Sequence, residues 1–596
     1  AVLTVVGDID EDAVHAAVER WFGPIAANPA LPAHPDLELK APLVATRRTI
    51  RDRVPDPRLH VAFRLPPIGD PSLPAAEVAC QILASGRGSR LHRRLVREEQ
   101  VAQDVSLDVL AFAGGASLAV GAATLRPGAS PEQLERCYGE ELARLAAEGP
   151  TAVEMERALA LIESEEMAKL GDPEELADEI GDRTALVHGD CRRTWAEFDE
   201  RASRLAAAFV DAGLGHDSKI GLYLYNGNEY LESQFAAFKM RGVPVNVNYR
   251  YLDDELVYLL DNADAEALVF HSSLADRVAR IRERLPRIRL IVEVDDGGAG
   301  SSPDVLAYEP LLAAHAPMPR TERSETDTYM LYTGGTTGMP KGVMYDMGDI
   351  TRAFAAMGFP LLGAAAPDDP AEIAPFVRNA VASGFRLVSM PCAPLMHGTG
   401  VWLGAMIPHL GGGQVVTLQN RSLDPDEILR TVETEAVTHT TIVGDAFAKP
   451  IIRAIDAAIA SGRPYDTSSL QMIISSGVMW TAEVKEQILD RIEQVVLLDA
   501  IGSSEGSMGN SISMKGVPPR TGSFTSNPTT KVFTDDDREV QPGSDEVGMV
   551  AAGGAMVPKG YFKDPEKSAR TFRTIGGVRY SFPGDMAMVA ADGSLV

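Results

Sequence analysis

Apolar runs and helical patterns alternate in a regular rhythm along the middle of the chain. Short apolar runs typical of buried strands stand at Ile220–Tyr225, Val243–Val247 and Ala267–Phe270. Segments with the helical spacing of apolar positions, Tyr230–Met240 and Asp254–Asp261, separate them. Strands that alternate with helices are typical of βα units, whose strands pair in parallel. The pattern therefore predicts an α/β fold with mostly parallel sheets and flanking helices.

A capping box marks the beginning of this α/β part. Thr194 and Glu197 are spaced so that the side chain of each can accept a hydrogen bond from the backbone N–H of the other. The helix that follows has an apolar face and ends at Gly213. We therefore expect the α/β part to form one large domain over residues 181–596.

Residues 1–180 show a different pattern, in which strands and helices do not alternate regularly. The expected strands are Val2–Val6, Leu59–Leu65, Val105–Leu110 and Ser117–Leu125, the last two forming an antiparallel pair across Gly114-Gly115. The expected helices run from Asp10 to Phe22, from Ala75 to Ser85, and onward from capping residues Ser130 and Thr151. This part is therefore predicted to be a separate α+β domain.

Length and composition limit the kind of protein. A chain of 596 residues is too long for one compact domain, and 45% hydrophobic and 23% charged residues are ordinary for a globular protein. The net charge of −28 argues against a nucleic-acid-binding surface, which needs basic patches. Four scattered cysteines indicate a reducing compartment, and no apolar run has the length of a transmembrane helix. We therefore expect a cytoplasmic protein without a transmembrane segment.

The segment Thr333–Gly342 carries the strongest chemical signal. It follows a short apolar run, Tyr329–Tyr332, that is typical of a strand. Glycines and threonines then lead to Lys341, so backbone N–H groups, hydroxyls and one ammonium can face a polyphosphate. The spacing differs from that of a Walker A loop because Met339 and Pro340 stand between the last glycine and the lysine. A polar turn without a ligand is the structural alternative.

This segment resembles the phosphate-binding signature of the adenylate-forming superfamily, which contains acyl-CoA synthetases, luciferases and peptide-synthetase adenylation domains. The chain has Gly334 where the family has serine, which removes one hydroxyl and keeps the backbone cradle. The resemblance implies an ATP site. Its expected phosphate-binding residues are Thr333, Gly334, Gly335, Thr336, Thr337, Gly338 and Lys341.

A second segment, Ile501–Glu505, resembles the family element that contacts adenine and the α-phosphate and holds Mg²⁺. The resemblance implies apolar contact of Ile501 with adenine, because the family has an aromatic residue there. It also implies a hydroxyl from Ser504, and Gly502 beside the nucleotide. Glu505 and Thr337 are the expected Mg²⁺ ligands.

Four more segments follow the family's order. Ser475-Ser476-Gly477 resembles the backbone segment along the nucleotide, where Gly477 is expected to bind. Pro394–Gly398 resembles the segment that walls the acyl pocket, and it contains His397 in the passage to the acyl site. Gly560–Lys567 matches a further family run, and Asp585 matches the ribose-binding aspartate.

The expected chemistry explains these residue types. Activating a carboxylate with ATP expels pyrophosphate and builds negative charge on the phosphates, which Lys341 and Mg²⁺ on Glu505 would neutralise. A carboxylate such as Asp585 can accept from both ribose hydroxyls. Each residue also has a structural interpretation: Glu505 as a solvated loop acid, Asp585 as a turn residue, and His397 as a hydrogen-bonded core histidine.

The amino-terminal part resembles one homologous half of the insulinase-type (M16) zinc peptidases. The resemblance rests on Val5–Asp10, on Phe22-Gly23, and on Gly86–Leu91 leading to Arg97–Glu99. The family's zinc motif, His-x-x-Glu-His, does not occur in this sequence, and catalytic zinc needs about three protein ligands. We therefore expect a non-catalytic half without zinc, which the family suggests would pair with a homologous half.

Together the resemblances predict an enzyme, a ligase that uses ATP, Mg²⁺ and CoA. It would convert a carboxylic acid, fatty or with a steroid side chain, into an acyl-adenylate and then an acyl-CoA. Two alternatives remain open. One is an acyl-adenylate former that loads a carrier protein, and the other is a non-catalytic fusion of an M16-like scaffold with a ligase remnant.

Two features of the chain's layout lead to further expectations. The sequence stops at Val596, where the family continues into a small mobile domain that carries a catalytic lysine. A truncated chain of this kind is expected to bind ATP and to make acyl-CoA poorly. No linker marks the junction near residue 181. The simplest interpretation is an artificial joining of two reading frames, and the alternative is a natural fusion.

Overall fold

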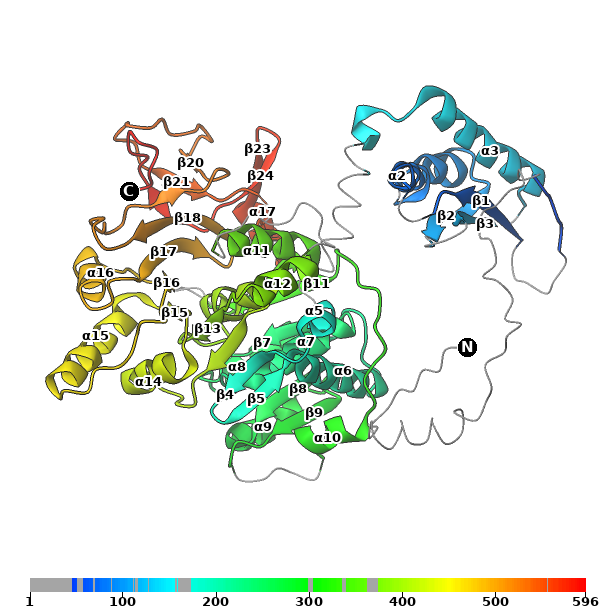
Figure 1. The fold of residues 1–596 in the computed structure, drawn as a ribbon. Coiled ribbons are helices and arrows are strands. Elements are labelled where there is room, and N and C mark those ends of the chain that lie inside the picture. The colour runs from blue at the N-terminus through cyan, green and yellow to red at the C-terminus, as the bar shows by residue number, and fades with distance from the viewer. Residues whose placement is uncertain are drawn as a thin grey trace, which may run out of the picture. The chain divides into compact units, whose positions relative to one another are not determined.

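The computed structural model describes residues 45–50, 57–67, 70–86, 88–110, 112, 116–126, 128–155, 158, 173–298, 304–334, 339–361, 373–554 and 556–596. The chain divides into two compact units, residues 1–162 and 163–596 (Figure 1). The elements expected at Val2–Val6 and Asp10–Phe22 lie outside the described residues, as do Gly114-Gly115 and the junction residues 159–172. No helix among the described residues is long and apolar enough to cross a membrane.

The first unit contains an antiparallel three-stranded sheet of order β1-β3-β2. Its strands are β1 (Arg58–Leu65), β2 (Ala102–Leu110) and β3 (Ser117–Leu125). Its helices are α2 (Leu73–Ala84), the π-helix η1 (His92–Glu98) and α3 (Pro131–Glu148). Leu91, Leu95, Ala123 and Leu134 belong to the core between these elements. The expected antiparallel pair is confirmed, because β2 and β3 pair from Ala102↔Leu125 to Leu110↔Leu118.

Capping residues begin both later helical segments of this unit, as the sequence predicts. The Ser130 Oγ accepts from the Gln133 N–H at 3.3 Å, and the Thr151 Oγ1 accepts from the Glu154 N–H at 3.3 Å. Glu154 also binds Arg90, with 2.7 Å between Nη2 and Oε2. The hydrogen bond from Arg90 lowers the pKa of Glu154 to about 2. Arg90, from the M16-like Gly86–Leu91 run, therefore has a structural role here.

The second unit contains two large sheets. The five-stranded parallel sheet has the order β10-β9-β8-β6-β7. Its strands are β6 (Lys219–Tyr223), β7 (Val243–Asn246), β8 (Ala265–His271), β9 (Leu290–Val294) and β10 (Leu306–Ala307). The nine-stranded sheet has the order β19-β18-β17-β16-β15-β13-β14-β4-β5. Its strands are β4 (Thr184–His188), β5 (Cys191–Thr194), β13 (Val388–Pro391), β14 (Gln414–Thr417), β15 (His439–Ile442), β16 (Met472–Ser476), β17 (Val496–Ser503), β18 (Gly506–Ser513) and β19 (Thr525–Ser526).

Helices separate most of these strands, as the βα rhythm predicts. Those in the first part of the unit are α5 (Pro173–Ile180), α6 (Trp195–Asp211), α7 (Asn228–Lys239), α8 (Asp253–Asn262), η2 (Ser272–Leu274), α9 (Ala275–Ile281), η3 (Arg282–Arg284) and α10 (Tyr308–Ala314). Those that follow in the chain are α11 (Met347–Leu361), α12 (Ile373–Ala382), the π-helix η5 (Thr399–Met406), α13 (Ile407–Leu410), α14 (Pro425–Glu435), α15 (Gly444–Ala460) and α16 (Ala482–Leu489). The predicted capping box of Thr194 and Glu197 begins α6.

Consecutive strand residues point to opposite faces of a sheet, so the buried clusters reveal the layers. Leu186 of β4 packs with α6 and α7, whereas Val187 packs with α14, α15 and α16. In β8, Val269 packs with α6 and α7, whereas Phe270 packs with α8 and α9. Helices α6 and α7 therefore lie between the two large sheets, and a further helical layer covers the outer face of each.

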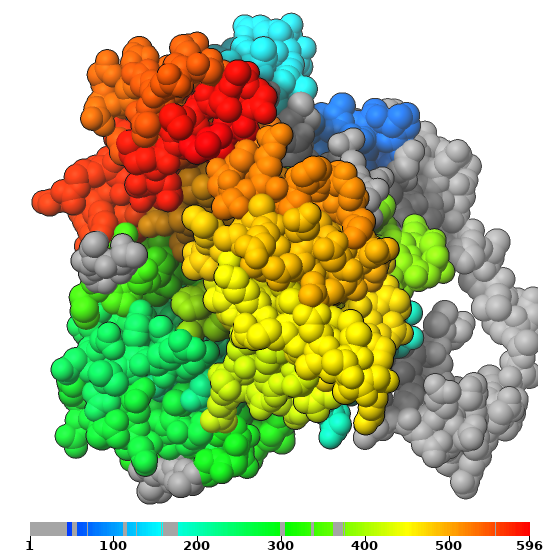
Figure 2. All heavy atoms as spheres, turned by 90° about the vertical axis from the view of Figure 1, so that its left-hand side faces the viewer, coloured from blue at the N-terminus to red at the C-terminus, as the bar shows by residue number. Residues whose placement is uncertain are grey.

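Smaller antiparallel sheets complete the unit. They are β11-β12-β22, β20-β21-β25 and β23-β24. Their bounds are β11 (Thr328–Thr333), β12 (Lys341–Asp346), β20 (Lys531–Phe533), β21 (Gly548–Ala551), β22 (Gly560–Tyr561), β23 (Phe572–Ile575), β24 (Val578–Ser581) and β25 (Met586–Ala587), with helix α17 (Pro565–Thr571) between β22 and β23. Figure 2 shows the yellow segment around α14 and α15 beside the orange and red carboxy-terminal segments on one face.

Candidate active site

The sheet topology brings several predicted site residues to one edge. Strands β13, β15, β16 and β17 are parallel neighbours, so their carboxyl ends meet at the same edge of the nine-stranded sheet. His397 follows β13, Gly477 follows β16, and Glu505 follows β17. Ligands in open α/β sheets bind beyond the carboxyl ends of strands. The edge that these residues share is therefore the candidate active site.

The predicted phosphate segment begins and ends on paired strands. Thr333 is the last residue of β11 and lies opposite Lys341, the first residue of β12. Gly334 follows Thr333, and a Cβ placed on it would meet only the Tyr251 hydroxyl within 4 Å, at 3.8 Å. The family's serine would therefore fit at this position. The central residues Gly335, Thr336, Thr337 and Gly338 lie outside the described residues.

Lys341 and Glu505 come together as the sequence predicts. The Lys341 Nζ lies 3.6 Å from the Glu505 Oε1, and both side chains are largely buried. The Tyr561 hydroxyl donates to the same carboxylate oxygen at 2.8 Å. Desolvation lowers the pKa of Lys341, and nearby Lys567 lowers it further, against the opposing effect of Glu505. Glu505 is therefore not a solvated loop acid.

Glu505 lies in the tight turn that joins β17 to β18. Its backbone N–H donates to the Ser503 Oγ at 3.0 Å, and the register shifts between Ile501 and Gly502. Ser504 precedes Glu505 in this turn and is partly exposed. Ile501 packs partly against an apolar cluster that contains Met508. The adenine contact expected of Ile501 therefore involves a side chain that also belongs to the protein's core.

Gly477 and Asp585 occupy different settings. Gly477 has φ of +94°, in the left-handed region that favours glycine, and it directly follows β16. Asp585 precedes β25, its side chain is exposed, and its backbone oxygen accepts from the Val550 N–H at 2.8 Å. The nucleotide roles of Gly477, Ile501, Gly502, Ser504 and Asp585 stay predictions.

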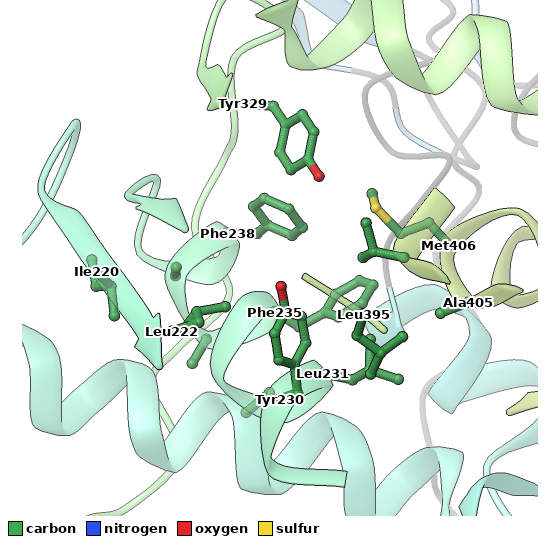
Figure 3. Close-up of a cluster of buried hydrophobic side chains, with 14 of the residues drawn as sticks. Ile220, Leu222, Tyr230, Leu231, Phe235, Phe238, Tyr329, Leu395, Ala405 and Met406 are labelled. Atoms are coloured by element: carbon green, nitrogen blue, oxygen red, sulfur yellow. The ribbon is translucent and has the colours of Figure 1, made fainter. Parts of the chain in front are cut away.

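The loop that carries His397 is held by its neighbours on both sides. Leu395 is fully buried in the core beside α7 and η5 (Figure 3), and its N–H donates to the Asn226 Oδ1 at 2.8 Å. A Cβ on Gly400 would lie 2.2 Å from the Pro394 oxygen, so the close turn requires glycine. The loop is therefore packed tightly, with His397 at its end.

His397 itself is exposed to solvent and is not a core histidine. Although its ring reaches solvent, desolvation by the surrounding protein lowers its pKa, and the positive charge of Arg250 lowers it further. The neutral imidazole is therefore favoured at neutral pH.

Asn246 links this loop to the phosphate segment. Its Nδ2 donates to the Tyr332 oxygen at 2.8 Å and to the Met396 oxygen at 2.7 Å. Its Oδ1 accepts from the Tyr332 N–H at 2.7 Å. Asn246, Tyr561 and Lys567 are not among the predicted site residues. The match of Gly560–Lys567 to a family run is the signal that was available for two of them.

The described residues contain no group of three or more His, Cys, Asp or Glu side chains arranged to hold a metal ion. Mg²⁺ in ATP-dependent enzymes is held by one or two carboxylates together with phosphate oxygens, so a single carboxylate beside a phosphate site suits it. The buried Glu505 next to Lys341 meets that requirement.

Two family models match the chain. Residues 174–562 match the family model described as AMP-binding enzyme, and residues 1–162 match the model described as peptidase M16 inactive domain. The chain therefore belongs to the AMP-binding enzyme family.

Two bacterial relatives illustrate the match. A medium/long-chain-fatty-acid–CoA/3-oxocholest-4-en-26-oate–CoA ligase of Mycolicibacterium smegmatis is 37% identical over 428 residues, which cover 71% of this chain and 76% of that protein. The medium-chain acyl-CoA ligase Mig of Mycobacterium avium is 37% identical over 440 residues, which cover 70% and 77%. Both of these relatives are named as CoA ligases.

Solved structures share the fold at lower identity. An anthranilate CoA ligase in complex with anthranoyl-AMP matches with a TM-score of 0.60 and 21% identity, over 71% of this chain and 76% of that one. ATP-bound MatB from Rhodopseudomonas palustris matches with a TM-score of 0.58 and 20% identity, over 72% and 78%. The α/β adenylate-forming fold of the second unit is thereby confirmed.

Proposed function

We propose that this protein is an acid–thiol ligase that activates a carboxylic acid with ATP and Mg²⁺ and transfers the acyl group to CoA. The observation that carries the proposal is the buried pair of Lys341 and Glu505 at the carboxyl edge of the sheet. One ammonium and one carboxylate beside a glycine- and threonine-rich segment suit a nucleoside triphosphate with its metal ion.

The proposed role of each residue follows from its charge and its position. Lys341 would neutralise negative charge that develops on the phosphates, which is the main contribution of an enzyme to this type of reaction. Glu505 would hold Mg²⁺, which when bound adds positive charge at the phosphate oxygens. The backbone and hydroxyls of Thr333–Gly338 and the Ser504 hydroxyl would contact the phosphates, and Asp585 would bind the ribose.

The proposed acid is a medium- or long-chain fatty acid or the side-chain acid of a steroid. The support is the naming of the relatives at 36–37% identity, including a 3-oxocholest-4-en-26-oate–CoA ligase of Rhodococcus rhodochrous. Transfer to a carrier protein remains the alternative to transfer to CoA.

The test is pyrophosphate release with ATP, Mg²⁺ and a panel of carboxylic acids. We expect release with acids of this class, and CoA consumption would then distinguish the ligase from a carrier-loading enzyme. Lys341→Ala and Glu505→Gln should each lower the adenylation rate by roughly 100-fold or more, because each removes charge stabilisation that the reaction requires.

Lys559→Ala is the control for these variants, since Lys559 pairs with Asp346 at 2.7 Å in an exposed position. It should keep the parent rate. Parent-like adenylation by both Lys341→Ala and Glu505→Gln would show that the site is elsewhere.

For the amino-terminal unit we propose a non-catalytic M16-like half that pairs with a homologous half. The support is the match of residues 1–162 to a family model described as inactive, together with a sequence that lacks the zinc motif. Metal analysis of the purified protein tests the first part. Stoichiometric zinc that is lost on substitution of a histidine in residues 1–162 would contradict it.

The proposed site of action is the cytoplasm. Cys80, Cys137, Cys191 and Cys392 are all free thiols in the structure, and free thiols are usual in reducing compartments.

A further inference from the structure

A second lysine lies beside Lys341 at the candidate active site. Lys567 belongs to α17, and its Nζ lies 5.8 Å from the centre of the Tyr561 ring. The Lys341 Nζ lies 4.5 Å from the centre of the same ring. Strand β22 pairs with β12 through Val343↔Tyr561, which places this ring beside the strand that Lys341 begins. The pairing of two short strands therefore brings two ammonium groups from distant segments to one aromatic ring.

The backbone around Lys567 is held in place. The Tyr561 N–H donates to the Ser568 Oγ at 2.8 Å, and the Ser568 hydroxyl donates to the Asp564 oxygen at 2.6 Å. The Asp564 carboxylate caps α17 by accepting from the Lys567 N–H at 3.0 Å. These bonds fix the first turn of α17 against β22. The Lys567 side chain is half-buried. The position of its backbone is defined by these bonds.

The charges around the ring point to the kind of ligand. Glu505 pairs with Lys341 and also accepts from the Tyr561 hydroxyl, while Asp564 is engaged in capping α17. Two ammonium groups that share one ring repel each other, and the carboxylate that pairs with Lys341 offsets one of them. One positive charge then remains at the ring, so the two lysines suit an anionic ligand, and the polyphosphate of the proposed ATP site is such an anion.

We propose that Lys567 is a second phosphate-binding ammonium, which with Lys341 holds the pyrophosphate portion of ATP and the released pyrophosphate. The inference deepens the proposed function and rests on it, because it assumes that Lys341 and Glu505 form the ATP site. Lys567 would act on the charge of the leaving group, whereas AMP, which lacks that group, would not depend on it.

The test is isothermal titration of the whole chain with inorganic pyrophosphate, ATP and AMP, each in the presence of Mg²⁺. Lys567→Met keeps the apolar stem over the ring and removes the charge. We expect it to weaken binding of pyrophosphate and ATP by roughly 10-fold to 100-fold, because a charge-assisted contact is lost. AMP binding should stay within about 2-fold, and Lys567→Arg, which keeps the charge, within about 3-fold of the parent.

Lys563→Met is the matched control. Lys563 lies four residues earlier on the same segment, stacks on Phe562 at 5.2 Å and pairs with Asp264 at 2.8 Å. It should leave all three affinities within about 2-fold.

Three outcomes would overturn the inference, and they differ from one another. Parent-like binding of pyrophosphate by Lys567→Met would show that Lys567 does not contact the ligand. A loss for AMP equal to that for pyrophosphate would show that the effect of Lys567 is not specific to the pyrophosphate portion. A parent chain that binds neither ATP nor pyrophosphate would overturn the proposed function itself, and the inference with it.

Discussion

At the scale of single residues, the orientation of the charged group of Glu505 depends on the side chains that contact it. Glu505 has one oxygen shared between the Lys341 ammonium and the Tyr561 hydroxyl. A hydrogen-bonded partner of a metal-binding carboxylate fixes the direction in which its oxygens point. We therefore expect Tyr561 to position Glu505, and the ammonium groups of Lys341 and Lys567 both lie near its ring.

Tyr561→Phe tests this role, because it removes the hydroxyl and keeps the ring. We expect the Mg²⁺ concentration that gives half-maximal ATP–pyrophosphate exchange to rise roughly 10-fold, since loss of such a partner weakens metal binding by about that factor. The measurement is a Mg²⁺ titration at saturating ATP. An unchanged Mg²⁺ requirement would mean that Glu505 is oriented without Tyr561.

Residue types explain which parts of the site the sequence could reveal. Lys341 and Glu505 stand in short motifs whose composition suits phosphate and metal, so they were predicted and lie 3.6 Å apart. Tyr561 and Lys567 stand in a run with no chemical meaning of its own. Their position at the site follows from the pairing of β22 with β12, which no local pattern encodes.

At the scale of elements, Asn246 joins three segments at the candidate active site. It stands at the end of β7 and binds Tyr332 of β11 and Met396 of the His397 loop. Its side chain is buried, with both the amide nitrogen and the amide oxygen hydrogen-bonded to backbone groups. The strand that leads into the Gly334–Gly338 segment and the loop that carries His397 are therefore held by one amide.

Asn246→Ala removes these three bonds and leaves buried backbone groups of Tyr332 and Met396 without their partner. We expect the free energy of unfolding to fall by roughly 3 kcal/mol, since each buried group left unpaired costs about 1–3 kcal/mol. Urea-induced unfolding measures the change.

Asn262→Ala is the comparison, because Asn262 makes a single hydrogen bond to the same tyrosine, from the Tyr332 hydroxyl at 2.7 Å. Its expected cost is roughly 1 kcal/mol. Equal losses for Asn246→Ala and Asn262→Ala would show that the three-segment link adds nothing to the fold.

At the scale of the whole molecule, the two units differ in what they are expected to bind. Residues 1–162 and 163–596 form separate compact units, and the AMP-binding match begins at residue 174. The boundary near residue 181 stays a prediction. The binding of ATP can test which of the two units carries the proposed ligase function.

Saturating ATP with Mg²⁺ should stabilise only the unit of residues 163–596. A ligand at about 100 times its dissociation constant adds roughly 2.7 kcal/mol to the folded state that binds it. We therefore expect calorimetry to show two transitions, of which one moves to higher temperature with ATP. A shift of both transitions, or a single transition that does not respond, would contradict the assignment.

Buried histidines make the stability of the second unit depend on pH. Burial lowers the pKa of His271, His409 and His439 to about 4 each, against about 6.5 in an unfolded chain. A histidine with a lowered folded-state pKa keeps its full contribution above about pH 6.5, and that contribution is lost as the pH falls toward 4. The unfolded chain takes up protons that the folded chain cannot.

We therefore expect the free energy of unfolding to fall between pH 6.5 and 5, by up to about 1.4 kcal/mol per pH unit for each histidine. Urea unfolding at pH 7.5, 6 and 5 measures this. His409→Phe should reduce the slope by about a third, because His409 is one of three such groups and lies among the rings of Trp195, Phe198 and Phe235. A parent protein equally stable at pH 7.5 and pH 5 would contradict this.

The sequence by itself determined the kinds of elements and marked the Thr333–Gly342 segment as a candidate phosphate site. Helix and strand periods, capping boxes and the Thr333–Lys341 motif are properties of neighbouring residues, so they are visible without the fold. The observed α6, β6, α7, β7, α8 and β8 follow that pattern. The family's order of motifs added Glu505 to the same site.

Only the tertiary structure decided which distant residues meet. The Asn246 link, the two lysines on Tyr561 and the packing of Ile501 into an apolar cluster all depend on sheet order and strand register. The physical reason is that a local pattern specifies which face of an element is buried, whereas the partner of that face is selected by close packing of the whole unit.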